Sequence, residues 1–334
     1  MDLVNHLEGR LLFAVPKKGR LLQAALNLLE GADIQFRREN RLDIALCKNL
    51  PVALIFLPAA DIPTFVGEGR VSLGITGRDT VAEHATLVEA ARRAHRESGK
   101  STLTEDGEEV GGCQEIMDLG FGSCKLQVQV PVKGPYQSPN DLIGKNIGTS
   151  FVHLAEDYFA KLEAEQSGAN GSSSDSSRKL KTKIIELSGS VEAACALGVA
   201  DGIVDLVESG ETMKAAGLQA IDTVISSTAV LIKSKHPTNP SMVDLIASRI
   251  LGVITAQKYV LCQYNVKRDA LPRVTNITPG KRAPTINALE EAGWVAISVM
   301  VEKKKIATVM DELTAVGATD ILVLIIANTR TGAP

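Results

Sequence analysis

Residues 202–213 combine the residue types that can hold a phosphate group. The pattern predicts an apolar strand at 203–207, a turn at 209–212 and then a short helix. A helix N-terminus offers unsatisfied N–H donors and a partial positive charge, so this turn could bind a phosphate. Capping of the helix by Thr212, with Gly217 as its stop, would explain the same residues. The segment alone leaves both interpretations open.

Three carboxylates flank this turn, namely Asp205, Glu208 and Glu211. Carboxylate oxygens could hold a hydrated Mg²⁺ or the hydroxyls of a sugar, since Mg²⁺ prefers oxygen ligands and keeps several of its waters. A phosphate, a sugar and a magnesium ion together describe phosphoribosyl pyrophosphate (PRPP). PRPP is therefore the first ligand hypothesis for the segment.

The composition is that of a globular protein with two or three domains. The chain has 334 residues, of which 45% are hydrophobic and 22% charged. A net charge of −3 and only 4% aromatic residues argue against a nucleic-acid-binding protein. The five cysteines are widely spaced and are expected as free thiols, and the five histidines form no set with zinc-ligand spacing. We find no leader and no membrane-spanning run, so we expect a soluble, cytoplasmic protein without a membrane partner.

Strands alternate with helices over the first two-thirds of the chain, which predicts α/β structure with a largely parallel sheet. The first unit has expected strands at 11–15, 42–46, 52–57 and 71–75 and helices at 21–29 and 62–68. The second has expected strands at 125–130, 145–149, 183–187 and 202–207 and helices at 152–164 and 191–197. A strand at 224–232 is expected to return to the first unit, and a helix at 242–255 to lead out of it.

The last part of the chain predicts a ferredoxin-like βαββαβ module, of a type that often serves regulation or assembly. Its expected strands are 259–264, 285–289, 294–301 and 321–327, and its expected helices are 268–274 and 304–316. The predicted domains are residues 1–121 with 227–255, residues 122–226, and residues 256–334. Two polar segments, 92–112 and 166–177, are expected to be surface loops.

Residues 94–101 fit a loosened phosphate-binding P-loop pattern. That motif requires a buried strand before it and a helix after it. Here the preceding residues are helix-like and the following ones are polar, so a P-loop ATPase is rejected.

Six segments in order resemble the ATP phosphoribosyltransferase family in its long, histidine-regulated form, and look closest to fungal members. They are Pro-Lys-Lys-Gly-Arg-Leu at 16–21, the Asp-Ile-Pro and Leu-Gly-Ile-Thr-Gly elements at 61–69 and 73–77, Phe-Gly-Ser-Cys-Lys-Leu at 121–126, Ser-Gly-Ser-Val-Glu-Ala at 188–193, the segment 202–213, and 278–280 with 283–285. One position departs from the pattern, because Ser72 stands where the family usually has Asp. That Asp could bond a neighbouring loop, which Ser could partly replace, or it could touch substrate.

The resemblance implies a two-lobed, periplasmic-binding-protein-like α/β core followed by a ferredoxin-like, ACT-like regulatory domain. It assigns catalysis to Lys17, Arg20 and Glu192, and PRPP binding to Asp205, Glu208, Ser209, Gly210, Glu211 and Thr212. It assigns Mg²⁺ to Asp205 and Glu208, and ATP to Lys17, Gly19, Arg20, Gly74, Thr76, Gly77, Ser190, Val191 and Glu192. It assigns the inhibitor histidine to Thr278, Gly280, Ala283, Pro284 and Thr285.

The implied reaction transfers the phosphoribosyl group from PRPP to N1 of ATP and releases pyrophosphate, as the first step of histidine biosynthesis. The N1 lone pair needs no strong base, which agrees with the lack of a recognisable triad. The resemblance also implies AMP as a further inhibitor and a homo-oligomer that ranges from dimer to hexamer. A two-lobed binding protein and a purine-salvage phosphoribosyltransferase are the alternatives, although the first usually carries a leader and the second lacks the C-terminal module.

Overall fold

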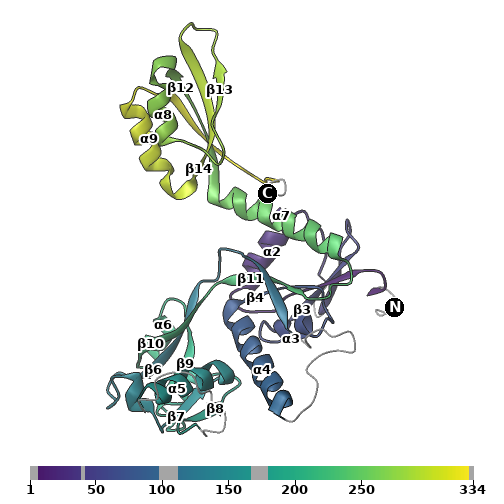
Figure 1. Cartoon of the computed structure of the whole chain (residues 1–334), viewed down its shortest axis with the longest axis vertical. Coiled ribbons are helices and arrows are strands. Elements are labelled where there is room, and N and C mark those ends of the chain that lie inside the picture. The colour runs from purple at the N-terminus through teal and green to yellow at the C-terminus, as the bar shows by residue number, and fades with distance from the viewer. Residues whose placement is uncertain (1–6, 39–41, 98–111, 167–179, 331–334) are drawn as a thin grey trace. The chain divides into compact units, whose positions relative to one another are not determined.

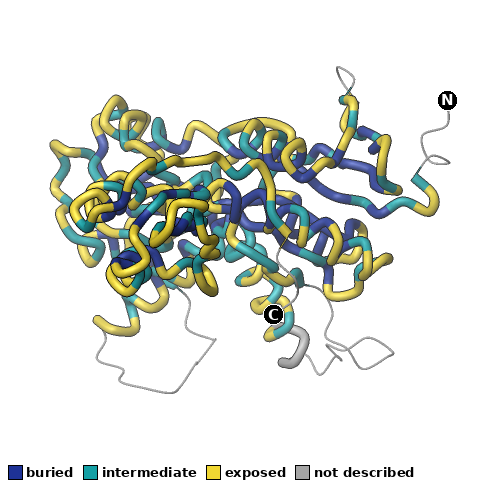
Figure 2. The backbone as a smooth tube through the Cα atoms, turned by 90° about the horizontal axis from the view of Figure 1, so that it is seen from above, coloured by how far each residue is buried: buried dark blue, intermediate teal, exposed yellow. Residues whose placement is uncertain are grey.

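The structure is a computed structural model that describes residues 7–38, 42–97, 112–166 and 180–330. It divides into two compact units, one formed by Met1–Ala25 with Phe36–Val243 and the other by Leu26–Gln35 with Asp244–Pro334. Within the described residues, the strands form sheets of six, five and four strands (Figure 1). Buried stretches of the backbone, dark blue in Figure 2, include most residues of β1, β3, β4 and β11. The predicted α/β class is therefore confirmed.

The first sheet has the order β2-β3-β1-β4-β11-β5 and forms the first lobe of unit one. Its strands are β1 (Leu11–Pro16), β2 (Ile44–Leu46), β3 (Val52–Leu57), β4 (Leu73–Gly77), β5 (Cys113–Asp118) and β11 (Ala229–Ser234). The helices α3 (Ile62–Gly67) and α4 (Arg78–Glu97) belong to this lobe. In the core strand β1, Phe13, Ala14 and Val15 are fully buried.

The second sheet has the order β10-β6-β9-β7-β8 and forms the second lobe. Its strands are β6 (Cys124–Pro131), β7 (Asn146–Thr149), β8 (Lys183–Glu186), β9 (Gly202–Val207) and β10 (Leu218–Ser227). Its helices are α5 (Val152–Gln166) and α6 (Glu211–Ala215), with short 3₁₀ turns η1 (Pro139–Leu142) and η2 (Val191–Ala193). Leu126 and Val128 of β6 pack with Phe159 of α5 to form its core.

Both sheets are mixed, where the sequence predicts a largely parallel sheet. β1 pairs in parallel with β3 and β4, but β11 is antiparallel to both of its neighbours. In the second sheet β7 is parallel to β8 and β9, but β6 is antiparallel to β9 and β10. The antiparallel strands β6, β10 and β11 adjoin the places where the chain passes between the lobes, and the alternating strand–helix pattern does not show them.

The predicted strand 224–232 is wrong as a single element, because it is two strands in two sheets. Ser227 of β10 pairs with Cys124, and Ala229 of β11 pairs with Gly77. No glycine or proline marks the change at Thr228, and the polar residues Ser226 to Thr228 are the only local sign of it.

Two further predictions differ from the structure. The predicted helix 191–197 is reduced to the turn η2, and its N-cap Ser190 lies at φ 49° in the left-handed region. Residues 92–97, predicted as part of a loop, continue α4. The rest of both predicted loops, residues 98–111 and 167–177, lies outside the described residues.

The segments that join the lobes are hydrogen-bonded to each other. The chain passes between the sheets at residues 119–123 and again at Thr228. Leu119 donates its N–H to the Ala229 carbonyl, and Ala229 donates to Phe121, both at 2.9 Å. These segments therefore form a short ladder of hydrogen bonds between the lobes.

Unit two contains the predicted ferredoxin-like module. Its strands β12 (Tyr259–Lys267), β13 (Thr285–Ala288), β14 (Trp294–Glu302) and β15 (Thr319–Ile325) have the order β13-β14-β12-β15, and neighbours are antiparallel. Its helices are α7 (Pro240–Lys258), α8 (Leu271–Ile277) and α9 (Ile306–Ala315), with turns η3 (Arg268–Ala270) and η4 (Lys303–Lys305), and α2 (Leu22–Gly31) contributes residues from 26 onward. Alternate residues of β12 and β14 are buried, as a sheet covered on one face requires.

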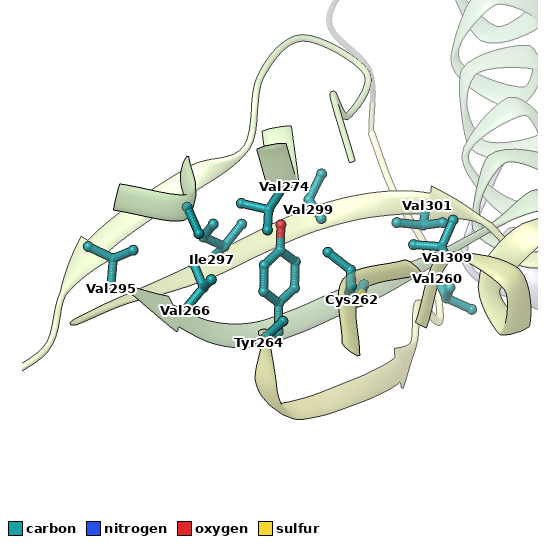
Figure 3. Packing of buried hydrophobic residues seen from close by; sticks show 13 residues of the cluster. Val260, Cys262, Tyr264, Val266, Val274, Val295, Ile297, Val299, Val301 and Val309 are labelled. Atoms are coloured by element: carbon teal, nitrogen blue, oxygen red, sulfur yellow. The ribbon is translucent and has the colours of Figure 1, made fainter. Parts of the chain in front are cut away.

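The core of this module is built around Tyr264 of β12. Its side chain is 1% exposed and points toward Val274 of α8 and Val299 of β14 (Figure 3). The buried hydroxyl lies 2.7 Å from Thr278 Oγ1. This hydrogen bond satisfies the polar end of the ring inside an otherwise apolar cluster.

Candidate functional site

The predicted phosphate turn connects the end of β9 to the start of α6. Gly210 is the N-cap of α6 and lies at φ 79°, a conformation that side chains with a Cβ rarely adopt. Thr212 lies one residue inside the helix and is exposed, so it does not cap α6 as the alternative interpretation requires. Gly217 at φ 69° follows the C-cap Ala216 and ends the helix.

A pocket of about 310 Å³ lies beside this turn. The start of β6, the end of β9 and the first turn of α6 supply its lining, which consists of Ser123, Cys124, Lys125, Gln127, Val207, Glu208, Ser209, Gly210, Met213 and Lys214. Lys125 and Lys214 are not among the residues singled out from the sequence. With Glu208 as the only acid among these ten residues, the two lysines make the net charge of the lining positive, which favours anionic ligands.

Arg20 connects the predicted Lys17–Arg20 turn to the phosphate turn. Its Nε lies 3.2 Å from Glu208 Oε1, and its Nη2 lies 3.6 Å from Asp79 Oδ1 at the start of α4. Its Nη1 donates to the carbonyl of Gly122, in the segment that joins the lobes. Arg20 therefore brings together parts of the site that are far apart in the sequence.

Lys17 lies at the same turn with a different partner. Its backbone N–H donates to Leu57, and its Nζ lies 2.8 Å from Asp43 Oδ2 in an exposed ion pair. Gly19, between Lys17 and Arg20, lies at φ 84°. Exposed pairs of this kind are weak, so the Lys17 ammonium can exchange Asp43 for a phosphate at little cost.

Asp205 and Glu192 act on each other electrostatically. Burial raises the pKa of the Asp205 carboxyl above its ordinary value, and the negative charge of Glu192 raises it further. Glu192 lies in η2, after the exposed Ser190 and the buried Val191. The structure therefore brings the charge of Glu192 within electrostatic reach of Asp205, and neighbouring carboxylates suit a divalent cation or sugar hydroxyls.

Three predicted ATP-binding residues lie in the core of the first lobe. A Cβ on Gly74 would lie 2.6 Å from Ile62 Cγ2, and one on Gly77 would lie 2.1 Å from Asp79 Oδ1. Thr76 is fully buried, and its hydroxyl donates to the Ala59 carbonyl at 2.7 Å. These positions are explained by packing, and their contact with ATP stays a prediction.

Ser72 and Cys124 are both buried, and the contacts of each are with other parts of the protein. The Ser72 hydroxyl lies 3.0 Å from Thr238 Oγ1 and accepts the Thr238 N–H at 3.3 Å. Of the two interpretations of this position, the structure therefore shows the bond to a neighbouring loop. Burial, and then the negative charge of Asp79, raise the pKa of the Cys124 thiol. The thiol stays neutral near pH 7, as expected of a packing residue.

The residues predicted to bind histidine fall into two groups. Thr278 is 1% exposed, and its hydroxyl is engaged by Tyr264 and by the Val274 carbonyl. The others lie in or beside the segment that leads into β13, with Gly280 at φ 70°, Pro284 partly buried, and Ala283 and Thr285 exposed. Of the predicted set, Ala283 and Thr285 therefore have the exposed side chains, whereas Thr278 is part of the core.

The described residues thus form two α/β lobes followed by a ferredoxin-like module. The family model described as "ATP phosphoribosyltransferase" matches residues 58–252, and the model described as "HisG, C-terminal domain" matches residues 256–328. The chain belongs to the ATP phosphoribosyltransferase family. These pentosyltransferases move the phosphoribosyl group of PRPP to ATP in the first step of histidine biosynthesis.

The similarity to curated relatives spans almost the whole chain. This chain is 57% identical over 330 residues to an ATP phosphoribosyltransferase of Yarrowia lipolytica and 54% identical over 331 residues to that of Saccharomyces cerevisiae. Each alignment covers 99% of this chain and 100% of the relative. A similar match, 54% over 332 residues, links it to the enzyme of Schizosaccharomyces pombe. The predicted long, fungal-like form is confirmed.

A solved structure shares the fold. The ATP phosphoribosyl transferase (HisG:HisZ) complex from Thermotoga maritima aligns with a TM-score of 0.53 and 21% identity, covering 74% of this chain and 98% of that one. In the described part of the chain, no helix has the length and apolar character to cross a membrane.

Proposed function

We propose that the pocket beside residues 209–212 binds PRPP, that Lys17 and Arg20 bind ATP next to it, and that Arg20 also contacts the pyrophosphate of PRPP. The observation that carries this proposal is the contact of Arg20 with Glu208, because it joins the turn after β1 to the turn after β9. Ser209 to Thr212 would bind the 5-phosphate through exposed hydroxyls and backbone amides. Asp205 and Glu208 would lie at the ribose hydroxyls or the metal.

The chemistry makes modest demands on the protein. N1 of adenine carries a lone pair and attacks C1 of the ribose without prior deprotonation. Breaking the C1–O bond builds positive charge on the sugar, as in glycosyl transfer, and negative charge on the departing pyrophosphate. Lys125 and Lys214 of the pocket lining, together with Arg20, would supply the cations that stabilise this leaving group. Glu192 and Asp205 would stabilise the positive charge on the ribose.

A magnesium ion fits this set of side chains. Among the described residues no group of three or more His, Cys, Asp and Glu side chains forms a metal cage. Asp205 and Glu208 offer carboxylate oxygens, and an ion with few protein ligands can be completed by phosphate oxygens and water. Bound there, Mg²⁺ would neutralise charge on the pyrophosphate.

The module in unit two would carry regulation. We place histidine at the segment before β13, with Gly280, Ala283, Pro284 and Thr285 as contacts and Thr278 as their support. Inhibition from there requires two global states that differ in histidine affinity. AMP inhibition, a dimer-to-hexamer assembly, a cytoplasmic location and the domain boundaries 1–121 with 227–255, 122–226 and 256–334 belong to the same proposal.

A single assay tests the activity. The protein is incubated with ATP, PRPP and Mg²⁺ while the ultraviolet absorbance of phosphoribosyl-ATP is followed, and histidine is then added. We expect product with ATP and a lower rate with histidine. Product from a free purine base, with none from ATP, would instead identify a salvage enzyme.

A further inference from the structure

Asp79 is a buried acid that none of the sequence motifs singles out. It lies in the first turn of α4 and is 1% exposed. Burying a carboxylate is costly unless hydrogen bonds and an opposite charge compensate it. Asp79 has both: Ser227 supplies the hydrogen bonds, and Arg20 supplies the opposite charge.

The hydrogen bonds come from Ser227, at the end of β10 where the chain passes back to the first lobe. The Ser227 hydroxyl donates to Asp79 Oδ1 at 2.5 Å and accepts the Asp79 backbone N–H at 2.9 Å. These paired bonds fix the carboxylate to the ladder between the lobes. Gly77 leaves room for it, because a Cβ there would lie 2.1 Å from Asp79 Oδ1.

The opposite charge comes from Arg20. A guanidinium is planar and rigid, so two partners that hold its Nη1 and Nη2 groups also fix the direction in which its Nε–H points. Asp79 and the Gly122 carbonyl hold the Nη2 and Nη1 ends, and Nε faces Glu208 on the phosphate turn. Glu208 is about half exposed, whereas Asp79 is almost completely buried, so Asp79 is the permanent partner and Glu208 the exchangeable one.

We propose that Asp79 is the positioning residue for Arg20: it holds the guanidinium at the ladder between the lobes, so that Nε stays directed at the phosphate turn when substrate replaces Glu208. This inference rests on the proposed role of Arg20 in substrate binding. Asp79 itself touches no substrate. It acts through Arg20, and Ser227 in turn fixes Asp79.

A purely structural role has to be separated from this one, because an acid in the first turn of a helix also stabilises the helix. A double-mutant cycle does so. Asp79→Asn keeps the shape and an oxygen for Ser227 but removes the charge. Arg20→Gln removes the guanidinium, and the double variant carries both changes.

We expect Asp79→Asn to raise the KM for PRPP by about tenfold, with a smaller change in kcat, since a charge-assisted contact is lost. In the Arg20→Gln background the same change should add nothing. An equal effect of Asp79→Asn in both backgrounds, or no effect in either, overturns the inference. If Arg20→Gln alone leaves the kinetics unchanged, the proposed role of Arg20 fails instead.

Two further variants keep the test decisive. Ser227→Ala leaves both charges in place but frees the carboxylate. It should raise the KM for PRPP less than Asp79→Asn does, and only when Arg20 is present, so it tests the inference even if Asp79→Asn does not fold. Asp141→Asn is the matched control, because Asp141 accepts the Gln137 and Ser138 N–H groups at 2.9 Å at the start of η1. It should lower the melting temperature and leave the KM for PRPP unchanged.

Discussion

Glu83 of α4 accepts the backbone N–H of His153, at the start of α5, at 2.8 Å. Its second carboxylate oxygen accepts the N–H of Leu154, also at 2.8 Å. α5 has no acid in its own first turn, so the neighbouring lobe provides the capping carboxylate. The two helices lie side by side in unit one (Figure 1). Glu83 is therefore both a helix cap and a tie between the lobes.

Replacing Glu83 by Gln should lower the free energy of unfolding by about 1–2 kcal/mol, because a charge-assisted cap of two amides is lost. Urea denaturation followed by far-ultraviolet circular dichroism measures the change. Glu89→Gln is the matched control on the same helix, since Glu89 is 73% exposed and pairs with Arg93 four residues on, within α4 itself. Equal losses for the two variants would mean that the contact with α5 contributes nothing.

Ser72→Ala should cost about 0.5–1.5 kcal/mol of stability, since it removes a hydrogen bond whose exposed partner, Thr238, can turn to water. The KM values for ATP and PRPP should not change. Ser72→Asp, which restores the residue usual in the family, should fold, because its carboxylate can accept from the same Thr238 groups. A change in either KM for Ser72→Ala would place this position at a substrate after all.

We expect Asp205 to lower the stability of the folded protein near neutral pH while supporting its activity. The pKa of Asp205 is raised in the folded protein, so the folded state holds this proton to a higher pH than the unfolded state does. The free energy of unfolding therefore falls as pH rises from the pKa of Asp205 in the unfolded chain to its pKa in the folded protein. Asp205→Asn should therefore melt at a higher temperature than the wild type near neutral pH, and the difference should vanish in acid. The same variant should be much less active. Thermal melts at several pH values test this, and a wild type that is the more stable protein at neutral pH would refute it.

Thr212→Ala should raise the KM for PRPP by about 10- to 100-fold, because a hydrogen bond to a charged phosphate is worth roughly 1.5–3 kcal/mol. Its stability should stay unchanged, since Thr212 is exposed and is not the N-cap of α6. Initial rates against PRPP concentration give the answer. Thr314→Ala is a suitable control, because this exposed threonine donates only to Met310 of its own helix. Unchanged PRPP kinetics for Thr212→Ala would remove Thr212 from the site.

The two threonines predicted at the histidine site should behave differently. Thr278→Val leaves the Tyr264 hydroxyl buried without its partner and should cost about 1–3 kcal/mol of stability. Thr275→Val is its control on the same helix, where the hydroxyl donates to Leu271. Thr285→Ala should weaken histidine inhibition and leave stability unchanged. Dose–response curves with histidine, beside thermal melts, separate the two effects.

The sequence predicted most elements, because their apolar periodicity is strong. The strands 52–57 and 202–207 have the predicted bounds. β5 was missed because its residues, Cys-Gln-Glu-Ile-Met-Asp, lack the apolar alternation of a strand. The break between β10 and β11 was missed for another reason, since Ser226, Ser227 and Thr228 are compatible with a strand and no glycine or proline marks the change of sheet.

The candidate site was predictable only where a motif is continuous in sequence. The turn at 209–212 could be found in this way, whereas Asp79 could not, because its partners Arg20 and Ser227 are distant in the chain. Lys125 stands inside a recognised element, but only the register that places it opposite Val207 shows that it lines the pocket. Side chains that act through tertiary contacts leave no local pattern.

The place of β11 between β4 and β5 sets the order in which the lobes can be completed during synthesis on the ribosome. Every strand of the second sheet lies between residues 124 and 227, so that lobe can close as soon as this segment has emerged. The first sheet must wait for Ala229–Ser234, and until then β4 and β5 have no strand between them. The first lobe is therefore the first to be synthesised but the last to complete its sheet. Until β11 emerges, the unpaired edges of β4 and β5 are the part of the nascent chain most exposed to mispairing.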